Sequence, residues 1–325
     1  MTDTHHEGKS THQVVGLFLG PLLAMAMIFS GAPTGLSEAG WMTAAVGILM
    51  AVWWATEAVP IAVTALLPIV VFPLLGIATI QDTTAPYANK VIYLFLGGFI
   101  VAFAMQRWNL HRRIALTVLQ YVGGNGRSLV GGFMLASALI SMWVMNTSTT
   151  MMLLPIAVSI IAVIHKTVDG LGDKGKDDFQ YSLLLGVAYG ATIGGMATLV
   201  GTAPNAMLAA FMQETYGTNI DFSSWMLVGL PLSALMLPLA WIVLTRVAFK
   251  VDFHTSDEGR ATLRRLKEDL GTIKTPEKRV AVVFTLMALT WVFRPFLVNL
   301  PGLSALDDSG IAMAGGIALF LIPSG

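Results

Sequence analysis

A row of polar side chains at residues 141–150 stands between two apolar arms, 129–145 and 151–164. The row reads Ser141-Met-Trp-Val-Met-Asn146-Thr147-Ser148-Thr149-Thr150. Polar groups at membrane depth cost several kcal/mol each unless something satisfies them. Hydroxyl groups and an amide at the tip of an apolar hairpin therefore indicate oxygen atoms that turn toward a buried ligand.

A second polar run interrupts a later apolar segment. It reads Gly194-Gly195-Met-Ala-Thr-Leu-Val-Gly201-Thr202-Ala-Pro204-Asn205. Glycine weakens a helix and proline breaks it, and here both occur where the hydroxyl groups concentrate. We predict that the two interruptions meet and form half of a transport site.

The two runs offer neutral oxygen ligands: side-chain hydroxyls, the Asn146 carbonyl and backbone carbonyls freed at glycines. Such donors suit a small hard cation such as Na⁺. Helix N-termini that begin after the breaks suit a carboxylate or a sulfate. Neither run contains Lys or Arg, so a bound cation has to supply the positive charge. Binding of the cation and of the anion would then be coupled.

A packing role is the alternative for these residues. Ser and Thr in membrane helices bond back to their own backbone, and Gly lets helices approach closely. For a single threonine the two interpretations are equally good. For the two clusters together, the coincidence of helix breakers and hydroxyls favours binding.

The composition predicts an all-α polytopic membrane protein. Hydrophobic residues make up 55% of the 325 residues, charged residues 12%, and the mean hydropathy is +0.72. Such a chain cannot cover a water-soluble surface. The formal net charge of zero implies no nucleic-acid partner, and the lack of cysteine excludes disulfides. Because no His-Glu-x-x-His, phosphate loop or Gly-x-Ser-x-Gly motif occurs, we do not expect an enzyme.

The distribution of basic residues predicts the topology. The connections 32–40, 213–225 and 299–308 contain no Lys or Arg, whereas most basic residues can share the other side. The positive-inside rule makes that side cytoplasmic, together with the N-terminus, in the inner membrane of a cell. Two full spans over 129–164 would leave the same charge pattern, but the polar tip favours a re-entrant hairpin.

These patterns divide the chain into five parts. We expect a cytoplasmic tail over 1–12, scaffold helices over 13–123 and half of a transport domain over 124–248. A charged linker helix at the cytoplasmic surface follows over 249–279, and the start of a second, inverted repeat over 280–325.

A weak similarity between two segments of the chain indicates the second repeat. The segment from Asp308 to Pro323 resembles the segment from Glu57 to Pro68, and an odd number of crossings between them inverts the second copy. We expect Glu57 to cap the helix that starts at Pro60, in preference to binding an ion. We expect His111 at the membrane interface.

At these residues the sequence resembles the divalent anion:sodium symporter family of dicarboxylate and sulfate transporters. That family carries a Ser-Asn-Thr motif at the tip of each of two re-entrant hairpins. The run from Met145 to Pro155 looks like the first tip, 194–205 looks like an unwound helix of the family, and 54–68 also fits its pattern.

The resemblance implies a homodimer of scaffold and transport domains that works as an elevator. It implies a sodium site formed by Ser141, the Met145 carbonyl, Asn146 and Gly201. The same resemblance implies that Asn146, Thr147 and Thr202 meet the substrate carboxylate. Met145 stands where the family motif has serine, which removes a hydroxyl but keeps a carbonyl ligand.

The second Ser-Asn-Thr motif does not occur in the sequence, so we expect the N-terminal part of a longer transporter, with an incomplete second repeat. The expected function is sodium-coupled symport of C4-dicarboxylates (succinate, malate, fumarate), impaired in a chain of this length. A sulfate or citrate symporter, coupling to protons, and a non-transporting membrane fragment are the alternatives.

Overall fold

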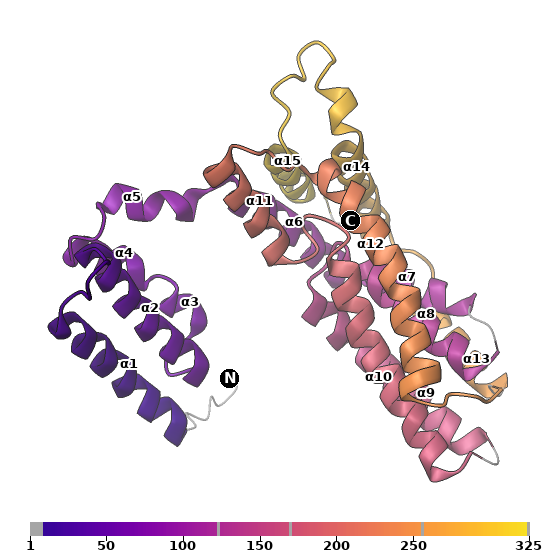
Figure 1. Cartoon of the computed structure of the whole chain (residues 1–325). Helices are drawn as coiled ribbons and strands as arrows, with labels where there is room; N and C mark the ends of the chain where they lie inside the picture. Colours follow the sequence, from indigo (N-terminus) through magenta and orange to yellow (C-terminus); the bar gives the residue numbers. More distant parts are fainter. Residues whose placement is uncertain (1–8, 122–123, 169–170, 255–256, 324–325) are drawn as a thin grey trace, which may run out of the picture. The chain divides into compact units, whose positions relative to one another are not determined.

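The computed structural model describes residues 9–121, 124–168, 171–254 and 257–323, and the regular structure in those ranges is helical (Figure 1). Six of the described helices are long and apolar enough to cross a membrane: Thr11–Ser30, Glu38–Thr56, Ile80–Arg107, Asn146–Thr167, Phe222–Ala248 and Thr275–Leu297. The prediction of an all-α polytopic membrane protein is confirmed. The described chain divides into two compact units, Met1–Asn89 (unit 1) and Lys90–Gly325 (unit 2).

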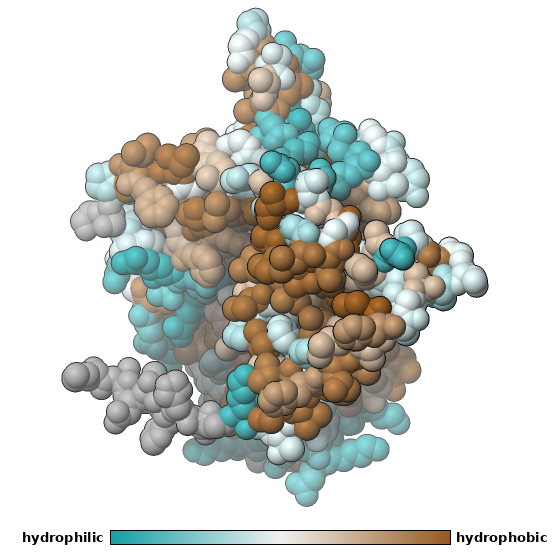
Figure 2. All heavy atoms as spheres, turned by 90° about the vertical axis from the view of Figure 1, so that its left-hand side faces the viewer, coloured by the Kyte–Doolittle hydropathy of each residue, from teal (hydrophilic) through white to brown (hydrophobic). Residues whose placement is uncertain are grey.

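Unit 1 is built on a pair of helices packed through glycines. Its described elements are α1 (Thr11–Ser30), α2 (Glu38–Thr56), α3 (Ile61–Thr64), α4 (Leu67–Leu74), α5 (Ile80–Thr84) and a 3-10 turn, Ala85–Ala88. A side chain at Gly16 would overlap Thr56, so only glycine allows α1 and α2 to lie this close. Phe18 and Phe29 are 69% and 86% exposed. Figure 2 shows broad areas of apolar side chains on one face of the molecule, as expected where lipid is the solvent.

One expectation for unit 1, the role of Glu57, is wrong, and the structure adds a helix break after it: α3 ends at Thr64 and α4 begins at Leu67, followed by Pro68. Proline has no N–H, and its ring clashes with the carbonyl four residues back, here that of Thr64. Glu57 does not cap the helix after Pro60. It ends α2 in the left-handed conformation (φ 49°), where its N–H bonds carbonyls of Trp53 and Trp54.

Unit 2 holds the remaining helices. They are α6 (Lys90–Arg107), α7 (Leu110–Gln120), α8 (Gly126–Ser141), α9 (Asn146–Thr167), α10 (Asp173–Gly195), α11 (Ala203–Tyr216), α12 (Phe222–Ile242) with a π-helical end (Val243–Ala248), α13 (Asp257–Glu268), α14 (Thr275–Leu297) and α15 (Asp308–Leu321). The predicted division of the chain at 123, 248 and 279 stays a prediction.

The core of unit 2 lies between α8, α9 and α10, which run beside one another (Figure 1). Gly190 of α10 sits so close to α8 that a Cβ would lie 2.6 Å from the Met134 carbonyl oxygen. One turn further on, a Cβ at Gly194 would overlap the Ala138 carbonyl. This glycine face sets the spacing of the two helices and brings their ends to one place.

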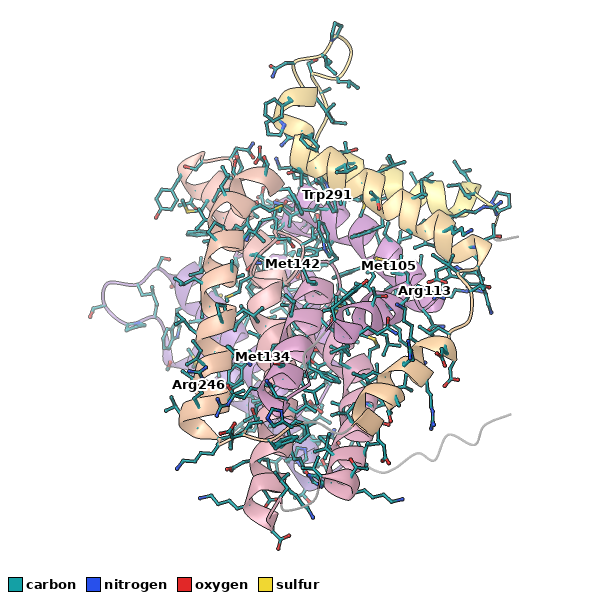
Figure 3. All side chains as sticks on the ribbon, turned by 90° about the vertical axis from the view of Figure 1, so that its right-hand side faces the viewer. Met105, Arg113, Met134, Met142, Arg246 and Trp291 are labelled. Atoms are coloured by element: carbon teal, nitrogen blue, oxygen red, sulfur yellow. The ribbon has the colours of Figure 1, made fainter. Side chains whose placement is uncertain are left out.

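A charged helix, α13, lies within the predicted linker 249–279 and packs on α7 and α9 with the buried Leu263, while its place at the cytoplasmic surface stays a prediction. Lys267 Nζ donates to Gln120 Oε1 at 2.7 Å, and Arg113 Nε lies 2.5 Å from Glu277 Oε1 (Figure 3 labels Arg113). These bonds hold α7 to the end of α13 and to the first turn of α14.

The expected interfacial position of His111 is wrong. Its ring is buried at 7% exposure, and Nδ1 donates to the Met105 carbonyl at 3.1 Å. Burial lowers the pKa of His111, and the charge of Arg112 adds to this effect against the opposing bond to Met105. The amphipathic α7 turns this side of the helix inward, so the ring is part of the core.

Candidate functional site

A tight turn separates two helices at the predicted polar tip, while the re-entrance of the hairpin stays a prediction. The helix α8 ends at Ser141, a tight turn follows over 142–145, and α9 begins at Asn146. In the turn, Val144 N–H donates to the Ile140 carbonyl at 3.0 Å. Residues 146–148 therefore stand at the start of α9, where backbone N–H groups have no partner within the helix, and the first helical bond runs from the Thr149 N–H to the Met145 carbonyl. Amide and hydroxyl side chains thus gather at a positive helix end.

The broken helix also has the predicted form. The helix α10 ends at Gly195, α11 begins at Ala203, and residues 196–202 lie outside both helices. Pro204 stands in the first turn of α11, the position in a helix where a missing N–H costs least. Thr202 is the N-cap residue of α11. A second positive helix end is thereby placed directly after the break.

The two interruptions meet, as predicted. Ser141 Oγ donates to Asn146 Oδ1 at 2.6 Å, and Thr198 Oγ1 donates to the Met142 carbonyl at 2.5 Å. Asn146 lies on Gly195, where a Cβ would overlap Oδ1 and lie 3.1 Å from Nδ2. Gly201 lies on the same residue, since its Cβ would be 2.9 Å from the Gly195 Cα. The structure thus brings Ser141, Asn146 and Gly201 together around Gly195.

The other predicted residues lie at the edge of this group. The Met145 carbonyl accepts the Thr149 N–H at 3.0 Å, and the Met145 side chain is 49% exposed. Thr147 is exposed and Thr202 half-buried. In the part of the chain that the structure describes, neither threonine hydroxyl has a hydrogen-bond partner. Their predicted roles as ligands stay predictions.

The donor set fits a sodium ion. Two neutral oxygens 2.6 Å apart, on Ser141 and Asn146, can both reach one ion at the roughly 2.3–2.6 Å that hard cations such as calcium prefer. No group of three or more His, Cys, Asp or Glu gathers among the described residues. The chemistry available at this place is therefore that of neutral oxygens and helix N-termini.

One expectation is wrong at Gly195, whose carbonyl is not free. Asn205, buried at 8% exposure, donates from Nδ2 to the carbonyls of Gly195 at 2.9 Å and Thr198 at 2.8 Å. Asn205 stands in the quoted polar run, three residues after Thr202, so its type and place in the first turn of α11 could have indicated this role.

The helix α12 satisfies two more carbonyls at the end of α10. Trp225 Nε1 donates to the Met196 carbonyl at 3.0 Å, and Ser233 Oγ donates to the Ile193 carbonyl at 2.7 Å. These residues are 29 and 40 positions away from their partners along the chain. No local pattern in the sequence indicates such pairs.

An ion network fixes the start of α12 against α14 and α15. Arg294 Nη1 lies 3.2 Å from Asp221 and 3.5 Å from Asp308. The Phe222 N–H donates to Asp308 Oδ2 at 2.8 Å. Burial raises the pKa of Asp221, but hydrogen bonds from Ser224 and Ser223 and the charge of Arg294 together bring it below its ordinary value. Asp221 is therefore an anion that holds the N-terminus of α12 in place.

Comparison with known proteins shows the family of the chain. Residues 11–323 match the family described as "Sodium:sulfate symporter transmembrane region". The chain belongs to this family, the divalent anion:sodium symporters. The resemblance that the motifs carry is thereby confirmed.

Relatives in this family are named for dicarboxylate transport. The chain is 39% identical over 317 residues to the sodium-dependent dicarboxylate transporter SdcS of Staphylococcus aureus, covering 97% of this chain and 61% of that protein. It is 39% identical over 322 residues to SdcS of Staphylococcus saprophyticus, covering 98% and 62%. The chain thus spans about three fifths of the length of these curated relatives.

Proposed function

We propose that the chain forms part of a sodium-coupled symporter that carries C4-dicarboxylates such as succinate, malate and fumarate across the inner membrane of a cell. One observation carries the proposal: Ser141 and Asn146, from the two sides of the hairpin tip, meet over Gly195 at the break between α10 and α11. The names of the SdcS relatives support the choice of sodium and of dicarboxylates.

In this proposal Ser141, the Met145 carbonyl, Asn146 and Gly201 bind one sodium ion. Asn146, Thr147 and Thr202 meet one carboxylate of the substrate, beside the N-termini of α9 and α11. The sequence 141–150 contains no basic residue, so the sodium charge is what makes the place attractive to an anion. Sodium binding therefore precedes tight binding of the substrate.

The movement that carries the site across the bilayer is proposed to be that of an elevator. A transport half, 124–248, slides against scaffold helices within a homodimer, with the N-terminus in the cytoplasm. Support comes from the family membership and from the many exposed apolar side chains that lipid would cover.

The test is uptake of radiolabelled succinate into proteoliposomes that contain the chain. We expect a sodium gradient to drive uptake and Asn146→Ala to abolish it. Asn299→Ala is the matched control, because Asn299 is an exposed asparagine in the connection after α14. Uptake that is independent of sodium and driven by a proton gradient would contradict the proposal. Uptake that is unchanged in Asn146→Ala would also contradict it.

Sulfate is the second candidate substrate, because the description of the matching family names it. The same proteoliposomes decide between the two. Excess unlabelled succinate, malate or fumarate should suppress the labelled uptake, and excess sulfate should not. Uptake of labelled sulfate that succinate fails to suppress would assign the site to sulfate.

A further inference from the structure

We propose that Trp291, on α14, is a positioning residue for the sodium site, acting through Trp143. The inference rests on the proposed function, because it concerns the same site. Trp291 supplies none of the candidate ligands and lies in the sequence beyond α13, in the predicted second repeat. It belongs to a group of stacked rings, Trp143, Phe222, Phe284 and Trp291, which we call the aromatic platform.

Trp291 has a fixed orientation. Its side chain is 0% exposed, and Nε1 donates to the Asp308 carbonyl at 2.9 Å. Its ring stacks on Phe222 with centroids 4.7 Å apart and lies parallel to Trp143 at 6.5 Å, with 4° between the planes. Buried aromatic rings held on both a face and a polar edge have one orientation available.

The first segment that rests on the aromatic platform is the hairpin turn. Trp143 is the second residue of the turn and precedes Asn146 by three positions. Its neighbour Met142 accepts the Thr198 hydroxyl at its carbonyl (Figure 3 labels Met142 and Trp291). Phe284 meets the Trp143 ring edge-on at 5.0 Å. A shift of the Trp143 indole therefore moves the turn that carries Met145 and Asn146.

The second segment is the break between α10 and α11. Leu199 and Val200, 3% and 8% exposed, pack in the same cluster as Phe222 and Trp291. The next residue is Gly201, the candidate carbonyl ligand, while Thr198 bonds the hairpin turn. Both ligand-bearing segments thus have apolar residues that pack on the platform. The platform sets the distance between them.

A cation site depends on such distances. Replacing Trp291 by a smaller side chain lets both segments relax, so the oxygens no longer converge. We expect the sodium concentration for half-saturation to rise about twofold to tenfold, the range that one aromatic pair carries. Substrate affinity measured at saturating sodium should recover, because the substrate ligands themselves are unchanged.

Sodium binding can be read without transport, because the chain has no cysteine. Ala203→Cys places a single thiol at the exposed first residue of α11, beside Thr202. Sodium should slow its reaction with a maleimide, and the sodium concentration at half protection is the readout. Trp291→Ala, Trp291→Phe and Trp143→Ala are compared in this background, with the amount of folded protein measured by gel filtration.

Trp241→Ala is the matched control. Trp241 is a half-buried tryptophan of unit 2 that, like the fully buried Trp291, donates to a backbone carbonyl, that of Arg127 at 2.8 Å, but at the far end of α12. Trp241→Ala should leave the midpoint, the sodium concentration at half protection, unchanged. Trp291→Ala should raise the midpoint and Trp291→Phe should raise it less. If Trp291→Ala does not fold, Trp291→Phe and Trp143→Phe decide.

The outcomes separate this inference from the proposed function. Variants that lower the amount of folded protein but leave the midpoint in place would show a merely structural role and overturn the inference. The inference is also overturned if the double variant shifts the sodium concentration at half protection by the sum of the shifts of Trp143→Ala and Trp291→Ala. Two residues that act through one shared contact should give a smaller combined shift. If sodium gives no protection even with Trp291 present, the sodium site itself fails, and the proposed function fails with it.

Discussion

The hairpin tip and the break between α10 and α11 both interrupt helical structure near one point of the molecule. They differ in how far their residues are exposed. The break is closed in: Ala197 and Thr198 are fully buried and Leu199 is 3% exposed. The tip is open, since Met145 is 49% exposed and Thr147 is also exposed.

The difference lies in where the backbone hydrogen bonds go. Backbone groups that leave a helix need partners, above all at membrane depth. At the break these partners are Asn205, Trp225 and Ser233, whose side chains donate hydrogen bonds to four carbonyls of residues 193–198. The tip keeps the N–H groups of a helix start and a set of neutral side chains. We infer that the break is the rigid base of the site and that the tip is the part a ligand completes.

The largest effect should come from Gly195→Ala. The added methyl group would occupy the place of the Asn146 amide, so base and tip can no longer touch. We expect sodium-dependent uptake to fall at least about tenfold, because an oxygen displaced by an ångström loses most of its interaction. The protein should still fold, since the obstacle is the end of a side chain.

Two glycines serve as controls for that variant. Gly47→Ala in α2 meets nothing within 4 Å and should preserve uptake. Gly194→Ala meets the backbone of α8 at Ala138 and should lower the yield of folded protein instead. Normal uptake by Gly195→Ala would mean that Asn146 and the break need not touch.

Asn205→Ala should distinguish base from tip by stability. It leaves the Gly195 carbonyl without a partner, at about 1–3 kcal/mol, and leaves the Thr198 carbonyl with only the long 3.4 Å bond from the Gly201 N–H. Thr147→Ala, at the exposed tip, should change the free energy of unfolding by less than about 0.5 kcal/mol. Unfolding midpoints in detergent micelles measure both. Equal midpoints for the two variants would contradict a rigid base.

An effect smaller than that of Asn205→Ala, and opposite in sign, is expected at Thr149. Its side chain is fully buried in the first turn of α9, and its hydroxyl has no partner among the described residues. Thr149→Val should therefore raise the free energy of unfolding by about 1 kcal/mol. Thr245→Val is the matched control, because the buried Thr245 hydroxyl donates to the Trp241 carbonyl at 2.7 Å, and its loss should destabilise. A lower unfolding midpoint for Thr149→Val would show that this hydroxyl already has a bond.

Much of the architecture could be predicted from local sequence. Pro204 and the glycines around it predict the break, since a missing N–H and a missing side chain act on the residue's own backbone. The long apolar runs predict the helices for the same reason. Pro68 predicts the break between α3 and α4 by the same argument, although it stands within an apolar run.

Other features depended on residues far away in the chain. His111 looked interfacial because its neighbours are basic, yet it packs into the core of unit 2. The carbonyl of Gly195 looked free because it ends a helix, yet Asn205 reaches it. Trp291 carries no local signal for its place beside Trp143, 148 residues earlier in the sequence.

The sequence by itself determined where the helices break and which oxygens stand at the breaks, because backbone sterics and hydropathy are properties of each residue and its neighbours. Only the tertiary structure decided that Asn146 rests on Gly195, that Asn205 closes the break and that Trp291 stacks behind the turn. Those contacts exist because the glycines of α10 let α8 approach and because α12 and α14 pack over the ends of both helices.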